Sequence, residues 1–178
     1  MAFDQGLPPK RIQLTLFLDE NTSEGIEHLR KTFNPEQYTL IPAHVTLCRE
    51  DELAQIEKII QRLSVLELAS VTIDFGKATR FSDGKGVMLP ATGDNAPFQA
   101  LRAQILQGFV EKPRRHEPHI TLMHPRNATC TDAIFEQIQK YRLPERITFR
   151  SISLIEQEMG QEWRVLRVFA CTVFIRKP

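Results

Sequence analysis

The sequence predicts an α+β fold with two similar lobes on either side of a central cleft. Three observations support this prediction. Segments with alternating apolar residues, typical of strands, are interspersed with segments whose apolar residues recur every three or four positions, typical of helices. The pattern His-(β-branched residue)-Thr-Leu occurs twice, at 44–47 and at 119–122. Both copies lie within the same order of elements, which indicates an internal duplication with a pseudo-two-fold arrangement.

Length and composition are those of one globular domain. The chain has 178 residues, of which 42% are hydrophobic, so it can bury a core. We expect a single domain over residues 1–178, with approximate lobes at 10–82 and 83–178. The 23 basic and 22 acidic residues leave a net charge of +1. This balance argues against coating of duplex DNA, which requires a strongly basic face, and is compatible with a nucleotide or an RNA end as partner.

Cysteines and hydropathy indicate an intracellular protein. The three cysteines (Cys48, Cys130 and Cys171) have no CxxC spacing, which is typical of a reducing compartment and gives no sign of structural zinc. The opening residues, 1–9, read as an arm and lack the apolar centre of a signal peptide. No segment reaches the roughly 20 apolar residues that a membrane span requires. We expect a cytoplasmic monomer that does not contact membranes.

The first lobe begins with strand-like alternation and then changes to helical periodicity. In order, the expected elements are a strand over 11–18, a helix capped by Asn21 and ended by Pro35, the first His strand, a helix opening at Asp51 and Glu52, a strand over 68–75 and a paired strand over 77–81. The second lobe repeats this order. After a turn over 82–86, its expected elements are a strand over 87–89, a helix starting at 95–97 and reaching Phe109, the second His strand, a helix from Thr131, and strands near 146–155 and 163–175.

Each His motif predicts a strand with one polar and one apolar side. Successive side chains of a strand point to opposite faces, so His44 and Thr46 share one face, while the β-branched residue and the leucine share the other. His119 and Thr121 repeat this arrangement. The two histidines lie 75 residues apart (119 − 44). We expect the fold to bring the two strands together, with their polar sides facing each other across the cleft.

Two imidazoles in one cavity suit a reaction that removes one proton and donates another. The unperturbed histidine pKa is about 6.5, so a neutral and a protonated imidazole can coexist near neutral pH. Threonine hydroxyls are donors suited to the non-bridging oxygens of a phosphate. The two motifs therefore predict a metal-free phosphodiester site. The alternative from the residues alone is that both motifs are core strands of an unrelated α+β domain.

HVTL at 44–47 and HITL at 119–122 resemble the two His-x-Thr-x motifs of the 2H phosphoesterase superfamily. This superfamily includes the bacterial RNA 2′,3′-cyclic phosphodiesterases of the 2′-5′ RNA ligase family. The opening strand that ends Leu16-Phe17-Leu18, the helix before each motif and the closing strand from Trp163 also fit, so the resemblance covers most of the chain. It implies two antiparallel sheets, outer helices and a groove on the pseudo-two-fold axis.

The resemblance also implies an activity. It is the hydrolysis of a 2′,3′-cyclic phosphate on an RNA end or a nucleotide, with no cofactor and no metal. The resemblance assigns His119 as the general base and His44 as the general acid, with Thr46 and Thr121 on the phosphate oxygens. The sequence alone does not separate the two histidine roles, because the motifs are nearly equivalent. Microscopic reversibility adds a weak 2′-5′ ligation activity as a corollary.

Five further residues are candidates for substrate binding. Arg49 and His124 each follow a motif at the same offset, and His124 stands where the family usually has arginine, with Arg126 as a substitute cation. Arg115 belongs to the densest basic cluster and is suited to steering anions, and Phe81 is a candidate for stacking a base. No metal is expected, because histidines three residues apart on a strand point to opposite faces and no carboxylate pattern accompanies them.

Three rival functions remain open. The first is a small-molecule cyclic phosphodiesterase, for example one acting on ADP-ribose 1″,2″-cyclic phosphate, and the second is a 2′-5′ phosphodiesterase. The third is a nucleotide- or RNA-binding module without turnover on the same fold. Both motifs are intact, which favours an enzyme over a binding module, and a turnover assay separates the two.

Overall fold

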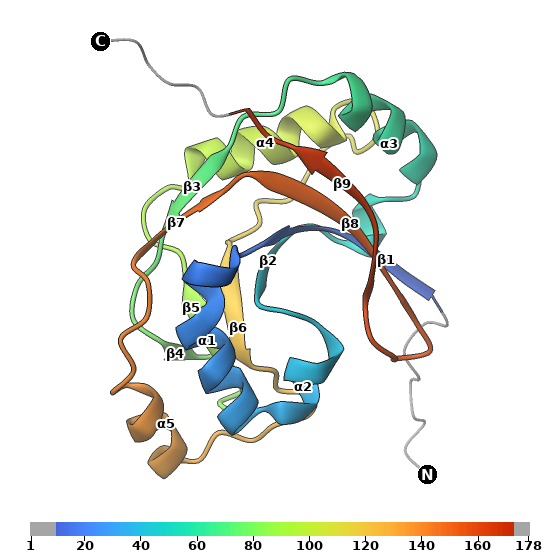
Figure 1. Cartoon of the computed structure of the whole chain (residues 1–178). Helices are drawn as coiled ribbons and strands as arrows, with labels where there is room; N and C mark the ends of the chain where they lie inside the picture. The colour runs from blue at the N-terminus through green and yellow to red at the C-terminus, as the bar shows by residue number, and fades with distance from the viewer. Residues whose placement is uncertain (1–9, 173–178) are drawn as a thin grey trace, which may run out of the picture.

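The chain forms a seven-stranded and a two-stranded antiparallel sheet, accompanied by five α-helices in the part that the structure describes (Figure 1). The computed structural model describes residues 10–172. The arm expected at 1–9 and the last residues of the strand expected over 163–175 lie outside this range. The predicted α+β class with two antiparallel sheets is confirmed.

The large sheet has the strand order β4-β5-β6-β2-β1-β8-β9, and the small sheet pairs β3 with β7. The strands are β1 (Lys10–Phe17), β2 (His44–Cys48), β3 (Val71–Asp74), β4 (Thr79–Arg80), β5 (Val87–Pro90), β6 (His119–Met123), β7 (Arg146–Phe149), β8 (Ser151–Glu158) and β9 (Arg164–Ala170). The helices are α1 (Glu20–Phe33), α2 (Pro35–Leu40), α3 (Ile56–Val65), α4 (Ala96–Leu106) and α5 (Asp132–Ile138), with a short 3₁₀ helix, η1, at Glu50–Glu52.

The two His strands are direct neighbours at the centre of the large sheet. β2 and β6 pair in antiparallel fashion, with Val45 opposite Ile120. The polar sides of the two strands therefore lie next to each other on one sheet, which corrects the expectation that they face each other across the cleft. Around this pair the order is symmetric, because β1 flanks β2 and β5 flanks β6. Helices α1 and α2 connect β1 to β2, and helix α4 connects β5 to β6.

The remaining strands are exchanged between the two halves of the chain. β4, at the end of the first half, pairs with β5, whereas β8, near the end of the second half, pairs with β1 and carries β9 on its other side. β3 and β7 also come from different halves and form the small sheet. The two sequence repeats are thus interleaved in space. The lobe boundaries at 10–82 and 83–178 stay a prediction.

The alternation within the His strands separates a core face from a groove face. Val45, Leu47, Ile120 and Leu122 are fully buried. Burial of a side chain of this size contributes about 1.5–3 kcal/mol relative to exposure. The histidine and threonine side chains of the same strands stay partly exposed.

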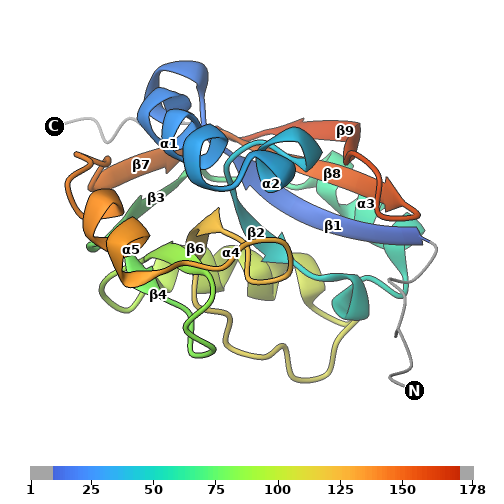
Figure 2. The ribbon, with the colours of Figure 1, turned by 90° about the horizontal axis from the view of Figure 1, so that it is seen from below.

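The helices lie in two groups on different sides of the strands, α1 with α2 and α3 with α4 (Figure 1 and Figure 2). No helix within residues 10–172 is both long enough and apolar enough to cross a bilayer. Both helical pairs contribute buried residues to the core, among them Ile26, Ile59 and Phe98. α4 ends at Leu106, so Phe109, expected within that helix, lies beyond it and packs against the core from the following segment.

The start of α1 differs from the prediction. The N-cap of α1 is Asp19, whose carboxylate accepts a hydrogen bond from the Thr22 amide at 2.9 Å, and Asn21 lies inside the first turn. α1 ends at Phe33, near Pro35 as expected, but Pro35 also begins the unexpected helix α2. It occupies the first position of α2, where the missing N–H of proline has no helical partner to lose.

Two further segments also differ from the prediction. The helix expected from Asp51 is the 3₁₀ helix η1, and α3 begins only at Ile56, because the buried carboxylate of Glu52 binds Arg102. The single strand expected over 146–155 is two strands in different sheets, which separate at Arg150. The apolar positions shift by one residue at this crossing, from Ile147 and Phe149 to Ile152 and Leu154, a shift that a bulge within one strand would also produce.

Candidate active site

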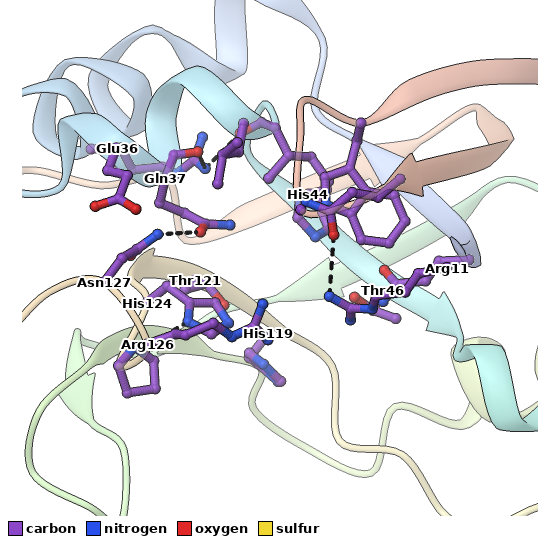
Figure 3. A pocket seen from close by; sticks show the side chains of 18 of the residues that line it. Arg11, Glu36, Gln37, His44, Thr46, His119, Thr121, His124, Arg126 and Asn127 are labelled. Carbon is purple, nitrogen blue, oxygen red and sulfur yellow. Dashed lines mark hydrogen bonds between the residues drawn. The ribbon is translucent and has the colours of Figure 1, made fainter. Parts of the chain in front are cut away.

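A groove of about 450 Å³ lies over β2 and β6, and both His motifs contribute to its lining (Figure 3). His44 and Thr46 come from β2, and His119 and Thr121 come from β6. Because the two strands are hydrogen-bonded neighbours, their polar faces form one continuous floor. The structure therefore brings together the four side chains that the motifs singled out, although their chemical roles stay predictions.

The two histidines are held in the same way. His44 Nδ1 lies 2.7 Å from the carbonyl oxygen of Pro42, and His119 Nδ1 lies 3.1 Å from that of Glu117. A carbonyl can only accept, so Nδ1 carries a proton in both rings. Nε2 is consequently the nitrogen that can gain or lose a proton at the opposite side of each ring.

A phenylalanine stands edge-on against each of these imidazoles. The Phe17 and His44 ring centroids are 5.9 Å apart, and those of Phe81 and His119 are 5.6 Å apart, both in T-shaped geometry. Phe81, proposed from the sequence as a base-stacking residue, does line the groove. Its observed contact is with His119, so it also restricts the rotation of that ring.

A buried ion pair on α1 fixes the segment that orients His44. Arg30 is 1% exposed and its guanidinium donates to Glu27 at 2.6 Å and to the Ile41 carbonyl at 2.7 Å. The Glu27 carboxylate also accepts from the Ala43 amide. The pair thus holds the residues on both sides of Pro42, whose carbonyl binds His44.

A second buried ion pair joins α4 to η1 of the first half. Arg102, also 1% exposed, donates to Glu52 at 2.6 Å and to the Arg114 carbonyl at 3.1 Å. It binds the Leu47 carbonyl in β2 as well. From the same helix, Gln99 donates to the His116 carbonyl at 2.6 Å, immediately before the Glu117 carbonyl that orients the second catalytic candidate. Each His strand is therefore fixed from the helix that precedes it.

The two threonine hydroxyls are available to a ligand. Thr46 and Thr121 line the groove, and neither side chain hydrogen-bonds to another residue within 10–172. A hydroxyl can donate one hydrogen bond and rotates to suit its partner. Both hydroxyls are thus free to donate to an anion lying over the sheet.

Burial lowers the pKa of both central histidines. The pKa of His44 falls from 6.5 to about 4, with Arg30 adding to the effect of burial and the hydrogen bond to Pro42 opposing it. Burial also lowers the pKa of His119, opposed by its hydrogen bond to Glu117 and assisted by the charge of Arg49. Desolvation disfavours the charged imidazolium, so both rings are neutral at pH 7.

Two more histidines line the groove, and they are also neutral at pH 7. Burial lowers the pKa of His116 to about 4, assisted mainly by Arg102. It lowers the pKa of His124 to about 4 as well, assisted by Arg126 and Arg11. An anion bound among these rings would stabilise their protonated forms and raise the pKa values again.

The cationic candidates separate into two groups. Arg49 and Arg126 line the groove, and neither forms an ion pair with another residue of the described range. Arg115 lies outside the groove lining, where it pairs with Glu117 at 2.6 Å and donates to the Asp94 carbonyl at 2.8 Å. The prediction that Arg115 belongs to the site is therefore not supported by its position.

His124 has the opposite tautomer from the two central histidines. The Arg126 amide donates to His124 Nδ1 at 3.1 Å, so this nitrogen accepts and the proton of the neutral ring sits on Nε2. The backbone of His124 is fixed by Asn34, whose side chain accepts from its amide at 2.8 Å and donates to Asn127 at 3.1 Å. Asn127 in turn donates to Gln37 at 3.0 Å. His124 is thus a fixed neutral donor.

Sequence reasoning missed the polar face of β1. Arg11 and Gln13 line the groove beside Gln157 of β8 and Trp163 of the β8–β9 turn. The signal was present, because Arg11, Gln13 and Thr15 alternate with apolar residues just as the His motifs do. Arg30, Asn34 and Asn127 gave no such signal, since their roles depend on contacts with distant segments.

No group of three or more histidine, cysteine or acidic side chains is placed to hold a metal ion within residues 10–172. The thiol of Cys48, on the strand that carries His44, is fully buried, and burial raises its pKa to about 12. A thiol with so high a pKa is not a nucleophile at neutral pH. The ionisable groups that remain available to the groove are imidazoles and guanidiniums, with one carboxylate, Glu36.

Comparison with solved structures identifies relatives with the same fold. E. coli LigT complexed with 3′-AMP is 17% identical, with a TM-score of 0.65, and the match covers 93% of this chain and 99% of that chain. E. coli LigT complexed with phosphate is 20% identical, with a TM-score of 0.64 and the same coverage. A structure described as a phosphoesterase is 20% identical, with a TM-score of 0.61, covering 92% of this chain and 99% of that one. Further LigT structures are complexed with NADP+ and ATP.

Family comparison places the chain by its sequence. A search of curated proteins gave no match. The model of the 2′-5′ RNA ligase superfamily matches residues 18–161, which include both His motifs, the groove floor and most of the elements described above. The resemblance to the 2H phosphoesterases is thereby confirmed, and the chain belongs to the 2′-5′ RNA ligase superfamily.

Proposed function

We propose that this protein is a metal-independent cyclic phosphodiesterase that hydrolyses 2′,3′-cyclic phosphates of RNA ends or nucleotides. The observation that carries the proposal is the matched orientation of His44 and His119, each with Nδ1 on a backbone carbonyl and Nε2 left to exchange a proton. Two such groups beside two free threonine hydroxyls suit an in-line displacement at phosphorus. Membership of a phosphoester-acting superfamily supports the same reaction class.

In the proposed reaction one imidazole acts as base and the other as acid. Nε2 of His119 takes a proton from water as the water oxygen forms a bond to phosphorus. The bond from phosphorus to one ribose oxygen breaks, and that oxygen takes a proton from Nε2 of His44. The product is a ribose with one free hydroxyl and one phosphomonoester. Proton exchange with solvent then restores both imidazoles. With the 5′-hydroxyl of a second RNA in place of water, the same displacement would form a 2′-5′ phosphodiester and release the 3′-oxygen as a hydroxyl.

The lowered pKa values fit a base that is ready before the substrate arrives. A neutral His119 can accept a proton at once. His44, with a pKa of about 4, requires a proton before it can act as the acid. A bound phosphodiester carries a negative charge that favours an imidazolium beside it, so substrate binding itself promotes the protonated form.

The remaining polar groups would hold the phosphate. Thr46 and Thr121 would donate to its non-bridging oxygens, where charge develops in the transition state. Arg49 supplies a guanidinium next to His119. His124 supplies an Nε2–H donor, in place of the arginine that the family usually has. The phosphate and 3′-AMP complexes of E. coli LigT support nucleotides as the ligand class.

The first test is turnover of a panel of 2′,3′-cyclic mononucleotides with EDTA present. We expect activity in the wild type and losses of roughly 10²–10⁴-fold in His44→Ala and in His119→Ala. His28→Ala is the matched control, because His28 is exposed on α1 and outside the groove lining. Circular dichroism checks that each variant is folded.

Other outcomes would point to the rival functions. If cyclic mononucleotides are inert, oligonucleotide ends, 2′-5′-linked dinucleotides and ADP-ribose 1″,2″-cyclic phosphate are the next substrates. Activity that survives both histidine substitutions would contradict the two-histidine mechanism. Binding of nucleotides without turnover of any of these substrates would favour the binding module.

A further inference from the structure

The groove extends well beyond the two histidines along β1. Thr15 of β1 lies opposite Thr46, and Arg11 lies four residues further along the same strand. At about 3.3 Å per residue, these positions are roughly 13 Å apart. Arg11, Gln157 and Trp163 nevertheless line the same groove as the His motifs. A cyclic phosphate over the histidines would leave this end of the groove to another part of the substrate.

Three elements that are distant in sequence build this end. Arg11 Nε pairs with Glu50 of η1 at 3.1 Å, and Arg11 Nη1 donates to Gln157 of β8 at 3.3 Å. The guanidinium carbon lies 5.2 Å from the ring centroid of Trp163, a cation–π distance. The Trp163 amide donates to the Leu40 carbonyl at 2.9 Å, which ties the β8–β9 turn to α2. Arg11 and Trp163 therefore form a fixed platform.

The platform retains the capacity to bind an anion. Arg11 Nη2 has no hydrogen-bond partner among the described residues, while its Nε and Nη1 are engaged. Its side chain is only 12% exposed, so its charge is poorly screened by water. Figure 3 shows Arg11 and Arg126 reaching into the groove from different sides. Arg126, whose pKa is lowered by burial and by Arg11, has no ion-pair partner in the described range.

We propose that the Arg11–Trp163 platform is a second subsite, which binds the nucleotide adjoining the one that carries the cyclic phosphate. Arg11 would contact the phosphate between the two nucleotides, and Trp163 would contact the second nucleoside. The preferred substrate is then an oligoribonucleotide end and not a cyclic mononucleotide. This inference rests on the proposed function for the chemistry of the first subsite, but the platform can be tested by binding alone.

The kinetic test compares three substrates that share the same 2′,3′-cyclic end. They are a mononucleotide, a dinucleotide, and a dinucleotide whose internal linkage is an uncharged methylphosphonate. We expect kcat/KM to be roughly tenfold or more higher for the natural dinucleotide, as one charge-assisted hydrogen bond allows. The methylphosphonate linkage, Arg11→Gln and Trp163→Leu should each reduce the dinucleotide-to-mononucleotide ratio. Lys58→Gln, on exposed α3, is the control that removes a charge away from the groove.

The binding test uses the fact that Trp163 is the only tryptophan of the chain. Intrinsic fluorescence therefore reports on the platform whether or not the protein has catalytic activity. A dinucleotide with a terminal 3′-phosphate should change the emission saturably, and the matching mononucleotide should not. If no substrate is turned over but the dinucleotide still changes the fluorescence and the mononucleotide does not, the result contradicts the proposed function and supports the second subsite.

Several results would overturn the platform. Equal kcat/KM values for the mononucleotide and the dinucleotide would contradict the existence of a second subsite. Equal fluorescence changes with both ligands would place the terminal nucleotide itself at Trp163. A dinucleotide advantage that survives the methylphosphonate linkage would exclude the phosphate contact by Arg11. Loss of stability in Arg11→Gln with an unchanged ratio would make Arg11 a structural brace between β1 and η1.

Discussion

The three hydrogen bonds to Nδ1 divide the groove histidines by role. In His44 and His119 this nitrogen meets a carbonyl, and in His124 it meets an amide N–H. The first two rings therefore present an exchangeable Nε2, whereas the third presents a fixed N–H. The proposed reaction uses the first kind of ring for proton transfer and the second for phosphate binding.

The lowered pKa values predict the pH dependence of catalysis. The active free enzyme needs one protonated and one neutral imidazole, so kcat/KM should be bell-shaped. Both His44 and His119 titrate below 6.5, so the maximum should lie on the acid side of pH 6.5. In kcat the maximum should move to higher pH, because bound substrate raises both pKa values. Steady-state rates between pH 4 and 9 measure both profiles, and a kcat/KM maximum near pH 8 would contradict this assignment.

The threonines allow a second prediction at this scale. Thr46→Val and Thr121→Val keep the side-chain shape and remove only the hydroxyl. Each should lower kcat/KM roughly 10²-fold, by loss of a donor to the developing charge. Both side chains are only partly buried and bond to no described residue, so the melting temperature should change little. Either variant with wild-type kcat/KM would remove that threonine from the phosphate site.

At the residue scale, the alternation of apolar and polar residues showed which side chains share a face of a strand, and little else. Alternation correctly placed Thr46 beside His44 on the open face of the strand. It could not show that His44 Nδ1 binds the Pro42 carbonyl, because that contact depends on how the preceding segment turns. Arg115 looked as favourable as Arg126 by charge. Only the course of the backbone turns Arg115 away from the groove and Arg126 into it.

At the element scale, α1 and α4 each support the His strand that follows them. Arg30 and Arg102 reach from these helices to backbone carbonyls that no strand or helix partner satisfies. In both cases a carboxylate, Glu27 or Glu52, offsets the buried charge. Each half of the chain thus provides a buried arginine as well as a His motif, although Glu27 lies on the same helix as its arginine and Glu52 lies on η1.

Removal of either buried arginine should be costly. Arg30→Ala leaves Glu27 and the Ile41 carbonyl without their partner, and it should lower the free energy of unfolding by about 3–5 kcal/mol. Replacement of both members by Glu27→Gln with Arg30→Met should cost less, because no unpaired charge remains. Urea denaturation measures these values, with the exposed neighbour Lys31→Ala as control. An Arg30→Ala cost no larger than that of the control would show that the pair is not a support.

The elements were predictable where periodicity and tertiary partners agree. Both His strands and the α4 and α5 helices lie within a few residues of their expected positions. The α2 helix was missed because Pro35 reads equally as a stop and as a start. The β7–β8 boundary was missed because its only signal is a one-residue shift in the apolar alternation after Phe149, which a bulge within one strand would also produce.

For the whole molecule, the buried histidines predict a loss of stability in mild acid. His44, His116 and His124 have pKa values of about 4 in the folded protein and an ordinary value of 6.5 when exposed. Between these limits the unfolded chain binds more protons, so the free energy of unfolding falls as the pH drops from 6.5 toward 4. Denaturation midpoints across this range measure the slope.

A single substitution tests the origin of that slope. His116→Gln removes one titrating ring and keeps a polar side chain of similar size, so the dependence on pH should become shallower. His28→Gln, at an exposed position, should leave it unchanged. An unaltered slope in His116→Gln would assign the acid sensitivity to other groups.

The exchange of strands between the two halves also determines when the groove can form. β1 is synthesised well before its partner β8, which begins more than 130 residues later. β6, a partner of β2, also follows β2 at a large distance in the sequence. Such distant pairings give the fold a high contact order, for which slow folding is the rule. A nascent chain therefore carries the β8-side edge of β1 and the β6-side edge of β2 unpaired during most of its synthesis, and the complete groove is among the last features that it acquires.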